Sequence, residues 1–209
     1  MLATLVDQPF DNKDWVFEVK WDGVRAILFL HKTKGILKIV SRKGKTITHR
    51  YPEIVEAAKS SLSAIINCKE SIILDGEIVV LNNKGQPDFQ SHQRRMNLDS
   101  IKEIEKLSYK IPATYYLFDI LHFDGRNLQP LSFVERRKKL SDVIVIIDAN
   151  TRIRISDFFE EHGIDIFQKI KSMNLEGIVA KNKYSKYIQG TRSTYTRLRD
   201  NRIYKRRRK

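Results

Sequence analysis

The sequence predicts an α+β fold, and three observations support this class. Short strand-like segments are interrupted by helical segments at irregular intervals, unlike the regular alternation of a doubly wound parallel sheet. With 209 residues, of which 41% are hydrophobic, the chain is long enough to bury a substantial core. An aromatic content of 10%, with only 9 Gly and 5 Pro, excludes a disordered, collagen-like or solenoid protein.

The strands are expected where β-branched and aromatic residues cluster. In chain order these segments are Val16–Val19, Arg25–Leu30, Leu37–Ser41, Ile72–Leu81 across Gly76, Tyr115–Ile120, Arg152–Ser156 and Gly177–Lys181. Helices are expected from helical spacing of apolar residues and from start signals. They cover Pro52–Ile66, Leu98–Leu107, Ser132–Leu140 behind a Ser132 cap, and Ile164–Met173. No Pro-, Gly- or Ser-rich linker divides the chain, so residues 1–199 are expected to form one domain before a basic tail at 200–209.

Several classes of protein can be set aside. The apolar runs Ile78–Leu81 and Val143–Ile147 are far too short to span a membrane, and the first residues lack the basic flank and apolar stretch of a signal peptide. A soluble, cytoplasmic protein is therefore expected. Cys68 is the single cysteine and is expected to be a packing residue, since neither an internal disulfide nor a Cys/His zinc module can be built.

The net charge of +14 is concentrated at one end of the chain. Residues 181–209 hold 12 Lys and Arg and one acidic residue, Asp200. Such a block attracts polyanions because basic side chains neutralise phosphates and release counterions. A solubilising tail or a nuclear-localisation-like run has the same composition, so the charge alone does not establish nucleic-acid binding.

The first chemical motif is Glu18-Val-Lys-Trp-Asp-Gly-Val-Arg25, where an expected strand ends in a lysine. The lysine amine is followed by a carboxylate at Asp22 and a guanidinium at Arg25. An ordinary β-turn with Asp-Gly at its corner and solvated charges would show the same pattern.

Three further segments place acids or aromatics in apolar strands: Leu74-Asp-Gly-Glu-Ile-Val-Val80, Tyr115-Tyr-Leu-Phe-Asp-Ile120 and Glu176-Gly-Ile-Val-Ala-Lys181. A carboxylate such as Glu77 in an apolar strand needs a partner. Taken singly, Phe118 is typical of a core residue, and Glu176 with Lys181 is typical of a solvated ion pair. His92, in Asp88-Phe-Gln-Ser-His-Gln-Arg-Arg95, is interpreted as a solvated helix residue and receives no catalytic role.

In their order along the chain, these segments resemble the motifs of the covalent nucleotidyltransferases, the superfamily of ATP-dependent DNA ligases, RNA ligases and mRNA capping enzymes. Lys20-Trp-Asp-Gly-Val-Arg25 looks like the nucleophile motif, Asp75-Gly-Glu77 like the third, Tyr116-Leu-Phe-Asp119 like the aromatic motif and Glu176–Lys181 like the fourth. Trp15–Ala26, Ser41-Arg42 and Phe118–Gly125 are similar to the ligase domain of bacterial-type end-joining DNA ligases. The resemblance covers residues 1–195 and implies mostly antiparallel sheets flanked by helices.

The resemblance implies an ATP-dependent DNA ligase catalytic domain. Lys20 would attack the α-phosphorus of ATP, hold AMP covalently and pass it to a 5′-phosphate of nicked or broken duplex DNA in end-joining repair. Since a lysine amine titrates near 10.4, it needs nearby positive charge to release its proton. The candidates are Mg²⁺, or Mn²⁺ in its place, and the side chains of Arg25, Arg42 and Lys181.

Other roles follow from the same resemblance. Glu18 and the Val19 backbone would read the adenine edge, and Phe118 would stack on adenine. Glu77 would bond the ribose or position metal, and Glu176 would hold Mg²⁺, because hard carboxylate oxygens suit this ion.

The fifth motif departs from the family pattern. The family has a tryptophan followed by Lys-x-Lys, whereas this chain has Tyr195-Thr-Arg-Leu-Arg199. Arg197 and Arg199 therefore take the lysine positions at the α-phosphate, with a wide fork in place of a point charge. A slower first step is expected.

Family ligases continue into an OB-fold, whereas the printed chain ends at Lys209. Complete nick sealing by this chain alone is not expected, and an OB-fold domain or end-joining proteins acting in trans are the expected partners, with a nucleoid-associated location. The alternatives are an RNA ligase or capping-type guanylyltransferase, which share the lysine chemistry, and a degenerate, non-catalytic DNA-binding domain.

Overall fold

The structure is a computed structural model that describes residues 2–63, 70–144, 151–190 and 192–200. Cys68, the end of the helix expected at Pro52–Ile66, and nearly all of the basic tail at 200–209 lie outside the described residues. Contacts divide the chain into two compact units. The terminal unit contains residues 2–21, 129–135 and 156–200, and the central unit contains residues 22–128 and 136–155.

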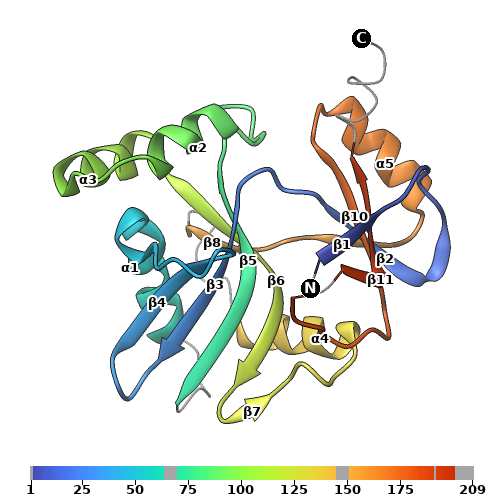
Figure 1. The fold of residues 1–209 in the computed structure, drawn as a ribbon, viewed down its shortest axis with the longest axis horizontal. Coiled ribbons are helices and arrows are strands. Elements are labelled where there is room, and N and C mark those ends of the chain that lie inside the picture. The colour runs from blue at the N-terminus through green and yellow to red at the C-terminus, as the bar shows by residue number, and fades with distance from the viewer. Residues whose placement is uncertain (1, 64–69, 145–150, 191, 201–209) are drawn as a thin grey trace. The chain divides into compact units, whose positions relative to one another are not determined.

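The terminal unit is built on a five-stranded sheet with strand order β1-β11-β10-β2-β9. The strands are β1 (Leu2–Leu5), β2 (Asn12–Val19), β9 (Phe158–Glu161), β10 (Gly177–Asn182) and β11 (Arg192–Asp200). Only the pairing of β1 with β11 is parallel among these described strands. Helix α5 (Gly163–Ser172) accompanies the sheet, as Figure 1 shows.

Aromatic residues form the core of the terminal unit. Trp15 and Phe17 of β2 pack with Phe167 of α5 in one buried cluster. Helix α5 approaches so closely at its first residue that a Cβ on Gly163 would lie 2.3 Å from the Phe10 carbonyl oxygen and from the ring of Phe17. Glycine is therefore required where the helix meets β2.

The central unit is built on a six-stranded sheet with strand order β4-β3-β5-β6-β7, and β8 pairs with β6 in parallel. The strands are β3 (Val24–His31), β4 (Ile36–Ser41), β5 (Ser71–Val80), β6 (Ala113–Phe123), β7 (Arg126–Asn127) and β8 (Ile153–Ile155). The helices are α1 (Pro52–Ser63), α2 (Phe89–Met96), α3 (Ile101–Lys110) and, from residue 136 onward, α4 (Phe133–Val143), with a 3₁₀ turn at Thr48–Arg50. Figure 1 shows β4, β3, β5 and β6 side by side.

One face of the central sheet carries the core. Leu28 of β3, Ile39 of β4 and Leu74 of β5 lie in one buried cluster with Ile54 of α1 and Leu140 of α4. Because side chains alternate along a strand, the residues between these core positions point to the opposite face. That second face carries several of the residues singled out in the sequence.

All seven expected strands and four expected helices are present, and their ends agree within a few residues wherever the structure describes them. Ser132 caps α4 as expected. The Glu135 N–H donates to the Ser132 hydroxyl oxygen at 3.4 Å, and the Ser132 N–H donates to the Glu135 carboxylate at 2.8 Å, which is the reciprocal arrangement of a capping box. Four strands were not expected: β1, β7, β9 and β11. Two of them, with the sequences Phe-Phe-Glu-Glu and Arg-Ser-Thr-Tyr-Thr-Arg-Leu-Arg-Asp, are too polar to give an alternating apolar pattern.

Helix α2 contains His92, as expected, but it corrects the interpretation of this residue as solvated. His92 is fully buried, and its Nε2 lies 2.9 Å from the hydroxyl of Tyr51. Arg95 is equally buried and binds the Glu53 carboxylate at 2.7 Å and the carbonyl oxygens of Arg50 and Ile111. The interpretation of His92 as a solvated residue was therefore wrong, because His92 and Arg95 belong to an internal polar network.

Membrane insertion through a helix finds no support in the described part of the chain, where every helix is too short or too polar to cross a bilayer.

Candidate active site

Lys20 lies at the end of β2, directly opposite the start of β10. Its N–H donates to the carbonyl oxygen of Gly177 at 2.9 Å, which fixes the backbone where the strand ends. The Lys20 ammonium forms an ion pair with the carboxylate of Glu176, the residue before β10. The lysine side chain is 20% exposed and the glutamate side chain 3% exposed, so the amine is accessible while its partner is buried.

Trp21 anchors the residue after the lysine. Its indole Nε1–H donates to the hydroxyl of Ser156 at 3.0 Å, and Ser156 is itself buried. Lys20 is thus held by a strand on one side and an anchored aromatic residue on the other, which favours a fixed amine position.

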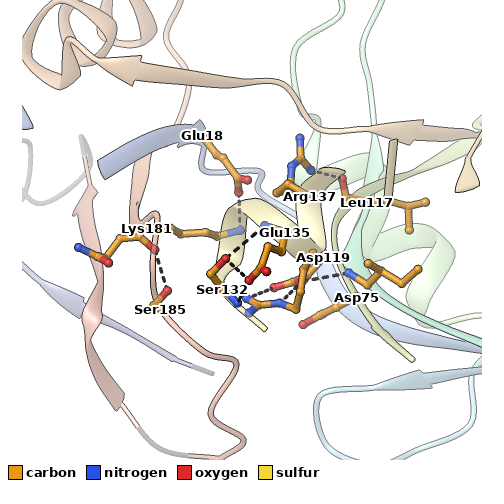
Figure 2. A network of polar contacts seen from close by, with 12 residues as sticks. Glu18, Asp75, Leu117, Asp119, Ser132, Glu135, Arg137, Lys181 and Ser185 are labelled. Carbon is orange, nitrogen blue, oxygen red and sulfur yellow. Dashed lines mark hydrogen bonds and ion pairs between the residues drawn. The ribbon is translucent and has the colours of Figure 1, made fainter. Parts of the chain in front are cut away.

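A second ion pair lies in the same sheet. The Lys181 Nζ lies 2.6 Å from Glu18 Oε2, and Figure 2 shows these two side chains directed toward one another. Glu18 and Lys181 are both more than nine-tenths buried, and the Lys181 ammonium lies 4.8 Å from the ring centroid of Phe133. Such buried charges must be paired or bind a ligand.

The backbone of Val19 is presented away from β10. The Lys20 N–H bonds Gly177, so the adjacent Val19–Ile178 pair is of the non-hydrogen-bonded type, whose N–H and C=O point to the other side. The register of β2 with β9 ends one residue earlier, at Glu18. This geometry suits a strand end that offers a donor and an acceptor to a ligand.

Arg197 and Arg199 lie on β11, the other neighbour of β10. Arg197 pairs with Ala180 and Arg199 pairs with Ile178. The structure therefore brings the expected fifth-motif segment into the sheet that carries Lys20 and Lys181.

In the central unit, Arg25 is held by an acid that was given no role in the sequence analysis. Its Nε lies 3.1 Å from Asp75 Oδ1 and its Nη2 lies 2.6 Å from Asp75 Oδ2, a bidentate ion pair with a fully buried carboxylate. The Arg25 guanidinium also lies 5.6 Å from the ring centroid of Phe118. Phe118 is half-buried between buried neighbours on β6, and the buried ion pair fixes the cation beside it.

Glu77 lies opposite Arg25 in the β3–β5 pairing. Burial, reinforced by the nearby carboxylates of Asp75 and Asp22, raises the pKa of the Glu77 carboxyl to about 8, although Arg25 acts in the opposite direction. Asp22 is thereby placed near Glu77. At neutral pH this carboxyl is mostly protonated and can both donate and accept a hydrogen bond.

Arg42 begins the exposed turn after β4, and its N–H donates to the Arg25 carbonyl oxygen at 3.1 Å. The central unit therefore collects Arg25, Arg42, Glu77 and Phe118, and the terminal unit collects the other expected site residues. The chain passes between the two units at four peptide bonds, after Trp21, Leu128, Glu135 and Ile155.

A buried ion pair beside Phe118 was missed in the sequence. Arg136 of α4 binds Asp119 through Nε at 2.8 Å and Nη2 at 3.0 Å, and Arg137 donates to the carbonyl oxygen of Leu117 at 3.4 Å. Figure 2 shows Arg137 directed toward Leu117. The signal available in the sequence was the adjacent Arg136-Arg137 pair in an otherwise amphipathic helix.

Comparisons with known proteins give matches over most of the chain. A family model described as ATP dependent DNA ligase domain matches residues 1–196. A DNA ligase of Pyrobaculum islandicum is 32% identical over 178 residues, which is 85% of this chain and 29% of that protein. The bifunctional non-homologous end joining protein LigD of Bacillus subtilis is 30% identical over 201 residues, covering 93% of this chain and 32% of its own length.

Among solved structures, the mycobacterial DNA ligase D complexed with ATP and MES matches with a TM-score of 0.76 and 27% identity. The match covers 96% of this chain and 59% of the mycobacterial chain. The chain thus spans about a third of the length of the two sequence relatives named above.

Proposed function

We propose, since this chain belongs to the ATP-dependent DNA ligase domain family, that Lys20 forms a covalent adenylate with ATP and that the AMP is passed to a DNA 5′-phosphate. The family and the fold inferred from the ordered motifs are confirmed. The observation that carries the proposed activity is the partly exposed Lys20 side chain paired with the buried Glu176 carboxylate, in the sheet that also holds the buried pair of Lys181 and Glu18.

The first step exchanges one bond at phosphorus. The neutral Lys20 amine forms an N–P bond to the α-phosphorus, and the bond from that phosphorus to the bridging oxygen breaks, so pyrophosphate leaves. The ammonium must first lose a proton, and the ion pair with Glu176 opposes this loss. The amine therefore becomes a nucleophile when nucleotide binding provides the Glu176 carboxylate with another positive partner.

Glu176 fits a Mg²⁺ ligand. The described residues hold no group of three metal-binding side chains, which agrees with the usual Mg²⁺ site of one or two carboxylates completed by substrate phosphates. Bound Mg²⁺ would supply positive charge at the phosphates. Mn²⁺, with the same preference for oxygen ligands, would serve in its place.

Glu77 is better suited to the ribose than to a metal. A carboxyl with a pKa of about 8 is mostly neutral at pH 7, so it can donate to one ribose hydroxyl and accept from another. Binding a cation directly would first require its deprotonation. We therefore assign the ribose to Glu77 and the metal to Glu176.

Adenine contacts are assigned residue by residue within each unit. Phe118 supplies an aromatic face, and the Val19 backbone supplies a donor and an acceptor at the end of β2. The free Oε1 of the buried Glu18, which makes no hydrogen bond among the described residues, can accept from an exocyclic amino group.

The remaining cations are assigned to phosphates. Lys181, Arg42, Arg197 and Arg199 would stabilise charge on the phosphoryl group during transfer. Arg25 forms a bidentate ion pair with Asp75, so its contribution is to hold positive charge beside Phe118 and Glu77. DNA joining would also engage an OB-fold domain or an end-joining protein in trans.

The test is covalent labelling. The protein, first treated with pyrophosphate to remove bound AMP, is incubated with Mg²⁺ and α-labelled ATP and examined by denaturing gel and intact mass. One AMP per chain is expected for the wild type and for Lys13→Ala, an exposed lysine on the same strand, but not for Lys20→Ala.

Label from GTP in place of ATP would favour a capping-type enzyme, and AMP transfer to nicked RNA alone would favour an RNA ligase. A wild-type chain that takes no label yet binds DNA would refute the adenylation proposal and leave a non-catalytic binding domain.

A further inference from the structure

A stretch of the central unit is free of acidic residues. Eight Lys and Arg residues and no Asp or Glu lie between Asp22 and Glu53, whereas acidic residues outnumber basic ones in the rest of residues 1–180. This stretch forms β3, β4 and the turns at both ends of β4. The excess of positive charge in this stretch, compared with the rest of residues 1–180, favours a polyanionic ligand.

Four lysines of this stretch form what we call the basic edge: Lys34, Lys38, Lys43 and Lys45. All four side chains are exposed. Lys34 lies in the turn before β4, Lys38 lies on β4, and the other two lie in the turn after it. Lys32 is left out because its N–H donates to the carbonyl oxygen of the exposed Glu70, which places an acidic residue beside it.

The register places Lys38 on the same face of the sheet as Arg25. Lys38 pairs with Phe29, and Phe29 lies four residues after Arg25 on β3, so the two share a face. The intervening core residues Leu28 and Ile39 point to the opposite face, where α1 packs. Lys38 is therefore about 14 Å along the strand from Arg25, at about 3.4 Å per residue.

Large apolar side chains accompany the lysines on this face. Phe29 is 36% exposed and Ile36 is 47% exposed, and by register they flank Lys38. A face that served only to hold solvated charge would not need an exposed phenylalanine and isoleucine. Lysines interleaved with apolar side chains suit a ligand that offers phosphates together with sugar and base surfaces.

We propose that the basic edge binds the phosphates of duplex DNA flanking the joined end, with Phe29 and Ile36 against the sugars. The proposal rests on the proposed function for its choice of DNA as the polyanion. Strand β4 rises by about 17 Å from end to end, which corresponds to about five base pairs at 3.4 Å each. Lys34 and Lys38 lie toward the end of β4 that is away from Arg25 and Arg42, so their contact adds affinity only when the duplex extends that far.

The lysines also have a simpler use, since β4 is an edge strand and lysines on edge strands prevent pairing with other chains. Glutamate substitution separates the two uses. A glutamate prevents edge pairing because it is charged, as a lysine is, but it repels phosphate whereas a lysine attracts it.

The experiment compares Lys34→Glu/Lys38→Glu with Lys102→Glu/Lys106→Glu. The control lysines are exposed on α3 and give the same change in net charge within the same unit. Binding of a labelled nicked duplex is measured by fluorescence anisotropy between 50 and 200 mM salt, with flanks of 4 or 12 base pairs. Thermal melting and size-exclusion chromatography confirm that both variants fold and stay monodisperse as the wild type does.

At 0.1 M salt the basic-edge variant should bind the long-flank duplex about 50-fold more weakly. The slope of log affinity against log salt should be shallower by about 2, because each phosphate contact releases about 0.9 counterions and two contacts are lost. The control and the short-flank duplex should change less than threefold. Equal weakening of both variants, or weakening independent of flank length, would overturn the proposal.

AMP attachment to Lys20 should be unchanged in the basic-edge variant, so failure of adenylation in the wild type would count against the proposed function and not against the basic edge.

Discussion

Replacing Glu77 by glutamine should remove a pH dependence of stability. The Glu77 carboxyl has a pKa of about 8 when folded and an ordinary value of 4.5. Below pH 4.5 both the folded and the unfolded chain hold this proton, so the residue does not lower the free energy of unfolding. As the pH rises from 4.5 to 8 the unfolded chain releases the proton while the folded chain keeps it, and stability falls.

The upper limit of this loss is about 5 kcal/mol, since each pKa unit is worth about 1.4 kcal/mol. The solvent-exposed surface of Glu77 shows that this residue is only half-buried. Solvent screening therefore reduces the expected loss of stability to about 2–3 kcal/mol. Glutamine keeps the shape and the hydrogen bonds without a titrating proton. The variant should match the wild type near pH 5 and exceed its free energy of unfolding by about 2–3 kcal/mol at pH 8.5.

Urea unfolding at five pH values, followed by far-ultraviolet circular dichroism, measures the difference between the two curves. Glu103→Gln, an exposed residue on α3, is the matched control and should follow the wild type. Parallel curves for Glu77→Gln and wild type between pH 5 and 8.5 would show that the carboxyl is ionised in the folded protein, and the assignment of a neutral Glu77 to the ribose would fail.

Three further outcomes follow from the contacts. Glu176→Gln should lower AMP attachment at 1 mM Mg²⁺ by about 100-fold, with partial recovery at higher Mg²⁺, and unchanged labelling would exclude the metal role. Arg136→Met should lower the free energy of unfolding by about 3–5 kcal/mol, because it leaves the buried Asp119 charge unpaired, and a loss below 1 kcal/mol in urea unfolding would contradict this. Gly163→Ala should cost about 1–3 kcal/mol and lower the melting temperature by several degrees, because its Cβ would overlap Phe17, and an unchanged melting curve would show that the contact relaxes freely.

Much of the fold was predictable because the strands that carry the core are rich in β-branched and aromatic residues. The strands β9 and β11 were not predictable in this way, since their polar and charged residues give no apolar alternation. They form because β2 and β10 offer unpaired edges, and this is a tertiary effect that local patterns do not contain.

The candidate site was also predictable only in part. Lys20, Glu77 and Glu176 could be selected from ordered motifs, because each motif keeps its residues within one short segment. The partner of Arg25 could not, since Asp75 lies 50 positions away and becomes a neighbour through the β3–β5 register. His92 was misjudged for a related reason, because composition does not reveal that Tyr51 will lie against its ring in the folded protein.

The placement of β11 between β1 and β10 also bears on synthesis at the ribosome. Strand β1 emerges among the first five residues, yet its partner β11 begins at Arg192. At about 5–20 residues per second, the first strand waits on the order of 10–40 seconds for its neighbour, while the central unit is already complete. Nascent chains halted after residue 155 should therefore protect the central unit from proteases and leave the Lys20 segment open to cleavage.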